Sequence, residues 1–380
     1  MVRSLSAITG SLALLLVISL PFSIALNSIA LVLIAVWIVI FWIFFPGYRN
    51  QLQGNRIELN WLSIPFVYAI SVLYSANFDR GINQFLNLTP VLLLPLFFIQ
   101  STIKNWLELL SKAYTVSILL VSLINILSIF QILPLDSKET TVSSLFHDAE
   151  KTSFIIWSGI LLGCRSSSSS RFWLWTTPLL FINLFYYGHI VLIFMASSTY
   201  LLLQLLPASR QRPDMVSRIL IFGTFIIILS LVYFNTFRTH LADAMFNLVA
   251  IYTNEAWTSG MSGFLIDLKF SFTQWIKHPF TGVGLGDYVD AIWNEYRDHG
   301  KEAPGYPYSQ LMHILVSCGA MTFWVVWVLI SSWIKYSRNR FLFFILIASI
   351  LVFAAPFKSQ VTATAFMLAV ILGSSPDEKD

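Results

Sequence analysis

Long apolar runs separated by short polar loops fill most of this 380-residue chain and constrain its fold more than any other feature. A helix that crosses a bilayer needs about 20 mostly apolar residues, because the hydrocarbon core is about 30 Å thick. Twelve runs meet or approach this length, near 5–22, 26–45, 60–76, 84–100, 113–133, 152–164, 172–187, 189–206, 217–236, 308–334, 341–356 and 358–373. The sequence therefore predicts an all-α polytopic membrane protein with about twelve transmembrane helices. The second run follows the first at once, so we expect a first transmembrane helix rather than a cleaved signal peptide.

The few charged residues predict the orientation of these helices. They make up 11% of the chain, against about 25% in soluble domains. If the N-terminus is cytoplasmic, fourteen of the 23 Lys and Arg fall in cytoplasmic loops and termini, and four fall in short loops on the other side. Short loops rich in Lys and Arg stay in the cytoplasm, so we expect both termini there. The basic residues are scattered, which argues against nucleic-acid binding.

One long polar segment interrupts the apolar runs late in the chain. We predict four parts, a bundle of about nine helices, an extracytoplasmic loop, about three further helices and a cytoplasmic tail, at 1–236, 237–307, 308–373 and 374–380. The loop holds three amphipathic stretches, His240–Ala256, Gly263–Lys277 and Asp287–Asp298. The middle stretch gathers apolar residues on one helical face, namely Leu265, Leu268, Phe272, Trp275 and Ile276. We expect that face to lie against the membrane surface or the helix bundle.

The end of the long loop carries a glycine motif. Gly282, Gly284, Gly286 and Asp287 form a GxGxGD pattern that follows a predicted helix and a His-Pro pair. One interpretation is a tight turn between two helices, with Asp287 capping the second helix. The alternative is a phosphate cradle formed by backbone N–H groups at a helix N-terminus. Almost no Asp, Glu, Lys or Arg falls inside a predicted span, so we expect any polar chemistry at the extracytoplasmic boundary.

Residues 263–320 resemble a known family of membrane proteins. The stretch WIKHPFTGVGLGD is followed by an aromatic-rich helix and by PYSQLMHILVSCG at the start of a span. This order resembles the O-antigen ligase and polymerase family, whose members join or extend glycans on the outer face of the bacterial cytoplasmic (inner) membrane. The resemblance implies a glycosyltransferase of surface-polysaccharide or lipopolysaccharide assembly. It would transfer a glycan from a polyprenyl pyrophosphate carrier to a hydroxyl of an acceptor glycan or lipid, without a cofactor or metal.

Two positions depart from the family pattern. Tyr308 and Ser309 stand where the family has His-Asn, and Ser198 lies where a mid-chain arginine is usual. Two alternatives therefore stay open. The chain is a family member that binds the glycan carrier without catalysis, or it is a flippase or transporter of lipid-linked glycans.

The resemblance implies a site where the long loop meets the late span. Three candidates would orient or deprotonate the acceptor hydroxyl: His299, Tyr308 and His313. Eight candidates would bind the pyrophosphate or the glycan: His147, Lys277, Gly282, Gly284, Gly286, Asp287, Arg297 and Gln310. A neutral imidazole is a better base near pH 7 than a phenol, whose reference pKa is about 10. We therefore expect a histidine, His313 above all, to serve as the base.

Overall fold

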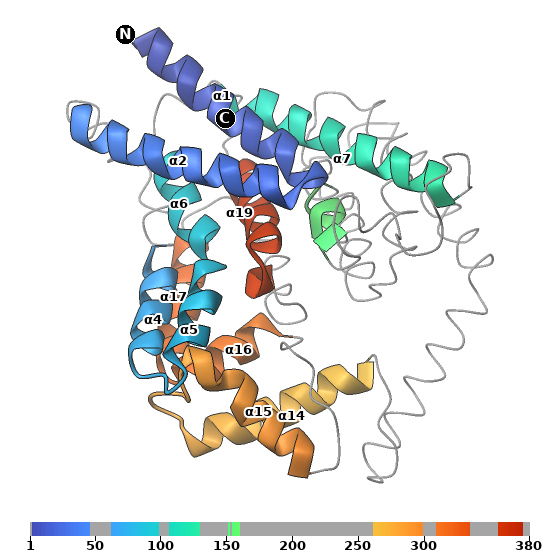
Figure 1. Cartoon of the computed structure of the whole chain (residues 1–380). Helices are drawn as coiled ribbons and strands as arrows, with labels where there is room; N and C mark the ends of the chain where they lie inside the picture. Colours follow the sequence, from blue (N-terminus) through green and yellow to red (C-terminus); the bar gives the residue numbers. More distant parts are fainter. Residues whose placement is uncertain are drawn as a thin grey trace.

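The computed structural model describes residues 2–45, 62–98, 106–129, 151–152, 154–159, 261–298, 309–334 and 356–374. Within these ranges the regular structure is helical and no strand occurs (Figure 1). Three stretches are long and apolar enough to cross a membrane, Ser4–Phe22, Ile24–Phe44 and Phe78–Phe98. The expectation of an all-α chain with membrane-spanning helices is confirmed to that extent. The predicted spans at 172–187, 189–206 and 217–236 and the stretch His240–Ala256 lie outside the described residues, as do all but the last residue of the span at 341–356 and six of the thirteen residues of the span at 152–164.

The first two helices, α1 (Val2–Phe22) and α2 (Ile24–Phe44), form an antiparallel hairpin. Ser23 caps α2 by accepting a hydrogen bond from the Leu26 amide at 3.3 Å. Thr9 and Trp37, equidistant from Ser23 along the chain, meet through an indole N–H to hydroxyl bond of 3.1 Å. The outer side of α2 exposes aliphatic residues that are each more than half accessible: Ile29, Val32, Val36, Val39 and Ile43. Such a stripe is unfavourable in water and suits contact with lipid.

The next three helices are α4 (Ser63–Leu73), α5 (Phe78–Leu86) and α6 (Thr89–Phe98). The predicted span at 84–100 was placed too late, because α5 and α6 together form the apolar stretch Phe78–Phe98. The Asn77 side chain accepts a hydrogen bond from the Arg80 amide at 3.2 Å and so starts the helix before the charged residues. Arg80, which the sequence assigned to a loop, therefore lies in the first turn of α5. The span predicted at 60–76 is a helix of only 11 residues.

The later helices are α7 (Leu107–Ile129), α14 (Met261–Lys277), α15 (Tyr288–Asp298), α16 (Gln310–Cys318), α17 (Met321–Ile334) and α19 (Gln360–Ser374), with short 3₁₀ turns η4 (Leu285–Asp287) and η5 (Pro356–Lys358). The prediction of one continuous span at 308–334 is wrong. Gly319 has a φ of 57° and ends α16 through a hydrogen bond from its amide to the Leu315 carbonyl oxygen. A Cβ at Gly319 would lie 2.6 Å from the Phe280 carbonyl carbon, so an approaching turn and a left-handed glycine break the helix here.

Residues distant in sequence share one hydrophobic core. It contains side chains from α1, α2, α4, α6, α7 and α19, together with the segment 154–157. A second cluster, made of Phe270, Tyr288, Ile292, Tyr296 and Val316, joins α14, α15 and α16. In Figure 1 this three-helix unit lies at one end of the group formed by α4, α5 and α17. The late glycine motif lies between α14 and α15 in the chain, and its Asp287 contacts the residues just before α5.

The structure decides between the two surroundings that were predicted for the apolar face of α14. Phe272 and Ile276 were expected to face the membrane surface or the bundle, yet they are 49% and 60% exposed. The side of α14 that packs inside the protein instead contains Asp267 and Ser271, both buried. Contact of the apolar face with the bundle is therefore excluded for these two side chains. Contact with the membrane surface remains open.

Candidate functional site

The glycine motif forms a turn that docks on the C-terminal end of α16. The amide of Val283 donates to the Val316 carbonyl oxygen at 2.8 Å, and the amide of Gly284 donates to the Ser317 carbonyl oxygen at 3.1 Å. The Ser71 hydroxyl, on α4, donates to the same Ser317 oxygen at 2.9 Å. The last carbonyl groups of a helix lack partners within the helix. Here the turn and α4 supply them.

All three glycines of the motif are required by this close packing. Gly282 and Gly284 have φ of 71° and 98°, a region that residues with a Cβ rarely adopt. A Cβ at Gly286 would overlap the backbone oxygen of Asn77. The amides of Gly282, Gly284 and Gly286 donate to protein oxygens, those of His278, Ser317 and Ser75. This geometry is that of the tight-turn interpretation, and a phosphate cradle would require these amides to exchange their partners.

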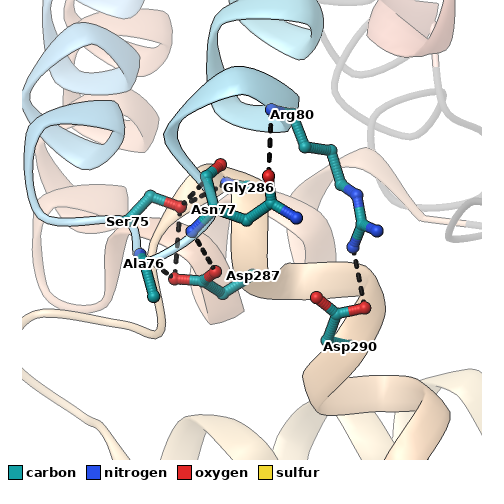
Figure 2. Close-up of polar contacts among 7 residues, drawn as sticks. All are labelled: Ser75, Ala76, Asn77, Arg80, Gly286, Asp287 and Asp290. Atoms are coloured by element: carbon teal, nitrogen blue, oxygen red, sulfur yellow. Dashed lines mark hydrogen bonds and ion pairs between the residues drawn. The ribbon is translucent and has the colours of Figure 1, made fainter.

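Asp287 does not cap its own helix as predicted. Its carboxylate reaches the turn before α5, where it accepts hydrogen bonds from the Ala76 amide at 2.6 Å and the Asn77 amide at 2.8 Å (Figure 2). The Ser75 hydroxyl donates to the same carboxylate at 3.1 Å and accepts from the Gly286 amide at 3.0 Å. The prediction failed because the residues that Asp287 contacts are about two hundred positions away in the sequence. The carboxylate joins the early helices to the late glycine turn.

A second polar contact joins the same two regions on their exposed side. Arg80, in the first turn of α5, forms an ion pair of 2.7 Å with Asp290, in the first turn of α15 (Figure 2). The two side chains are 39% and 56% exposed. An exposed pair of this kind contributes about 1 kcal/mol or less. The main fastening is therefore the set of hydrogen bonds that the partly buried Asp287 carboxylate accepts.

Gln310 and His313 lie together inside the core, at the start of α16. The Gln310 side chain donates to the Tyr68 hydroxyl at 2.7 Å and lies 3.2 Å from Nδ1 of His313. Its carbonyl oxygen accepts from the Phe357 amide at 3.0 Å. Gln310 is fully buried and His313 is 1% exposed. Gln310 thus connects α4, α16 and η5, and an acceptor sugar reaches His313 only if covering groups move.

A tyrosine extends this buried polar group toward α14. The Tyr288 ring meets the His313 imidazole edge to face, with centroids 4.7 Å apart. Its hydroxyl lies 3.3 Å from the Ser271 hydroxyl and 3.5 Å from a carboxylate oxygen of Asp267. Asp267 is 1% exposed, although carboxylates are rarely buried without a role. We define the buried polar cluster as Tyr68, Asp267, Ser271, Tyr288, Gln310 and His313.

The two predicted cations lie on the helices beside this cluster. Lys277, at the end of α14, forms an ion pair with Glu295 of α15. Gln274 donates to the same Glu295 oxygen at 2.7 Å. Arg297 is exposed and donates to the Asn294 side chain at 3.2 Å. A pyrophosphate would have to compete with Glu295 for Lys277, whereas Arg297 is held only by a neutral amide among the described contacts.

The structure brings together the glycine turn, Asp287, Gln310 and His313 through α16 and Tyr288. The predicted site residues His147, His299 and Tyr308 lie outside the described residues. The sequence reading missed four polar residues: Tyr68, Ser75, Asp267 and Tyr288. A signal for Asp267 was present, because it is the single carboxylate in the apolar run GFLIDLKF.

Within the described ranges, no three His, Cys, Asp or Glu side chains gather closely enough to hold a metal ion. No protein-family model matches this chain, and no curated protein sequence matches it. What the site can do is therefore judged from its chemistry. It offers the buried imidazole of His313, the buried carboxylate of Asp267, the hydroxyl of Tyr288 and the exposed guanidinium of Arg297.

Proposed function

We propose that this protein is a membrane glycan ligase or polymerase of surface-polysaccharide assembly. It would have about twelve transmembrane helices in the bacterial inner membrane, with both termini cytoplasmic and the segment 237–307 on the outer side. Its donor would be a glycan on a polyprenyl pyrophosphate carrier, and its acceptor would be a hydroxyl of a glycan or lipid.

The observation that carries the proposal is the buried polar cluster, to which α16 contributes Gln310 and His313 at its start while the glycine turn docks on its other end. Both motifs that resemble the O-antigen ligase family meet at this cluster, because Tyr288 directly follows Gly282–Asp287 and the later motif contributes Gln310 and His313. A purely structural turn needs neither a buried imidazole nor a buried carboxylate, because burying such groups costs free energy. Perturbed or buried titratable groups beside a helix junction are typical of functional sites.

The proposed reaction is an inverting substitution at the anomeric carbon. The acceptor oxygen attacks this carbon, the bond from the carbon to the pyrophosphate oxygen breaks, and the electron pair leaves with the pyrophosphate. The acceptor proton passes to a base, for which His313 is the candidate on the described residues. Arg297 would stabilise the charge that develops on the leaving pyrophosphate.

A second candidate is a carrier-binding protein without catalysis. It is favoured by the burial of Gln310 and His313, whose side chains already contact protein partners. In this case the cluster would stabilise the fold, and the exposed Arg297 would contact the carrier.

Reconstitution separates these functions. Purified protein in proteoliposomes is given a lipid-linked oligosaccharide and an acceptor glycan, and the assay follows glycan transfer, carrier translocation and carrier binding. The proposal expects transfer that depends on the lipid-linked donor. Binding without transfer would favour the second candidate, and translocation without transfer would identify a flippase.

A further inference from the structure

On α14 the packed side is mostly polar and the exposed side is mostly apolar, which is the reverse of a helix at a protein surface in water. At 100° per residue, positions 267, 270, 271 and 274 fall on one side, and positions 269, 272 and 276 fall on the opposite side. The packed side contains three polar residues, Asp267, Ser271 and Gln274, all buried. The outer side contains Lys269, Phe272 and Ile276, all exposed. Water as the outer medium would favour the reverse arrangement.

The apolar outer side continues past the end of the helix. Phe280, in the turn after α14, is 80% exposed. Its carbonyl oxygen accepts from the Ala320 amide at 3.1 Å, which places it beside the start of α17. The first turns of α17 expose three large aromatic residues, Phe323, Trp324 and Trp327. Exposed apolar side chains therefore occur both on α14 and on the first turns of α17, and the hydrogen bond between Ala320 and Phe280 joins the segments that carry them.

The location of α14 relative to a candidate span identifies the medium. Phe78–Phe98 has 21 residues, so it is about 30 Å long and matches the hydrocarbon thickness of a bilayer. Its Phe78 end is fastened to the glycine turn through Asn77 and Asp287. In Figure 1, α14 lies at this end of α5 and runs across the direction of α4 and α5. A helix at the end of a span and across its direction lies at the membrane boundary.

We infer that α14 is an interfacial helix whose Phe272 and Ile276 side chains, with Phe280, insert into the phospholipid bilayer that the spanning helices cross. Lys269 lies between the apolar residues on this face and extends its ammonium group to the lipid phosphates. The opposite, polar side of α14 then contributes Asp267 and Ser271 to the buried polar cluster. This inference does not depend on the proposed glycan transfer.

Site-specific fluorescence in proteoliposomes tests the inference. An environment-sensitive NBD label is attached at Phe272→Cys or Ile276→Cys, in a chain with Cys164 and Cys318 replaced by alanine. Val32→Cys, on the exposed stripe of α2, reports contact with lipid, and Asn294→Cys, on the exposed side of α15, reports contact with water. The vesicles contain phosphatidylcholine and phosphatidylglycerol, with and without a nitroxide-labelled lipid, and iodide serves as the aqueous quencher.

We expect labels at 272 and 276 to be quenched by nitroxide lipid, as the label at position 32 is, and to be protected from iodide. Quenching by iodide as strong as at position 294 would overturn the inference. Protection from both quenchers that disappears on dilution into excess lipid would also overturn it, because a second copy of the chain would then cover the face. Two label positions keep the test informative if one variant does not fold.

Discussion

The Asp287 carboxylate accepts hydrogen bonds from the backbone amides of Ala76 and Asn77, at 2.6 and 2.8 Å, and so joins two segments that are far apart in the chain. We expect Asp287→Asn to lower the free energy of unfolding by about 2 kcal/mol, because an amide supplies one acceptor and turns a donor toward a backbone N–H. Thermal unfolding of the purified protein in detergent measures the change. Asp290→Asn, which removes only the exposed pair with Arg80, should cost less than about 1 kcal/mol. Equal effects of the two variants would contradict this role of Asp287.

The close approach at Gly286 predicts sensitivity to a single methyl group. A Cβ at Gly286 would overlap the Asn77 oxygen and lie 2.6 Å from the Ser75 hydroxyl. Gly286→Ala should therefore destabilise the protein by more than about 2 kcal/mol, as overpacking typically does. The matched control is Gly81→Ala, since a Cβ there has its nearest neighbours at 3.4 Å and alanine favours helix. The yield of folded protein after detergent extraction and the unfolding temperature report the outcome. A Gly286→Ala variant as stable as the wild type would refute the packing argument.

The buried amide of Gln310 predicts an energetic coupling between α4 and α16. Gln310→Leu leaves the Phe357 N–H without its acceptor and should cost about 2 kcal/mol. Combined with Tyr68→Phe, the loss should be less than the sum of the two, by at least about 0.5 kcal/mol, because both changes remove the same 2.7 Å hydrogen bond. Tyr114→Phe serves as the control, since its hydroxyl contacts Ser158 instead. It should add to Gln310→Leu without coupling.

The proposed function predicts that transfer depends on His313 and Arg297. His313→Ala and Arg297→Ala should each lower kcat/KM for glycan transfer at least tenfold, which corresponds to about 1.4 kcal/mol of transition-state stabilisation. His278→Ala, an exposed histidine next to the glycine turn, should keep wild-type transfer. Tyr308→His, which restores the residue that the resembling family has, should preserve or raise transfer. Loss of transfer in Tyr308→His together with full activity in His313→Ala would move the site elsewhere.

The distribution of basic residues predicts the topology. Reporter fusions at Ser168, Arg212 and Ser337 should report the cytoplasm, and fusions at Thr141 and Asn294 should report the outer side. The reason is the excess of Lys and Arg in alternate short loops. Two or more fusions on the wrong side would show that the helix count is in error, because one missed helix inverts every later loop.

Apolar periodicity by itself determined the helical class and the positions of α1 and α2. A run of about twenty apolar residues has few alternatives, because a lipid environment leaves every backbone polar group to be satisfied within the segment. The same reasoning located α14 to within two residues. The glycine pattern at 282–287 indicated either a tight turn or a phosphate cradle. The family resemblance, and not the apolar pattern, directed attention to Gln310 and His313, which the structure places side by side.

Only the tertiary structure decided which groups these residues contact. The break at Gly319 depends on the approach of Phe280, and the partners of Asp287 lie more than two hundred residues earlier. The sequence left both the membrane surface and the helix bundle open for the apolar face of α14, because a hydrophobic pattern shows two unlike faces without telling which medium lies outside. For Asp267 and Ser271 the protein interior supplies hydrogen-bonding partners, whereas a lipid surface would not. That choice depends on contacts between segments, and local sequence does not encode those contacts.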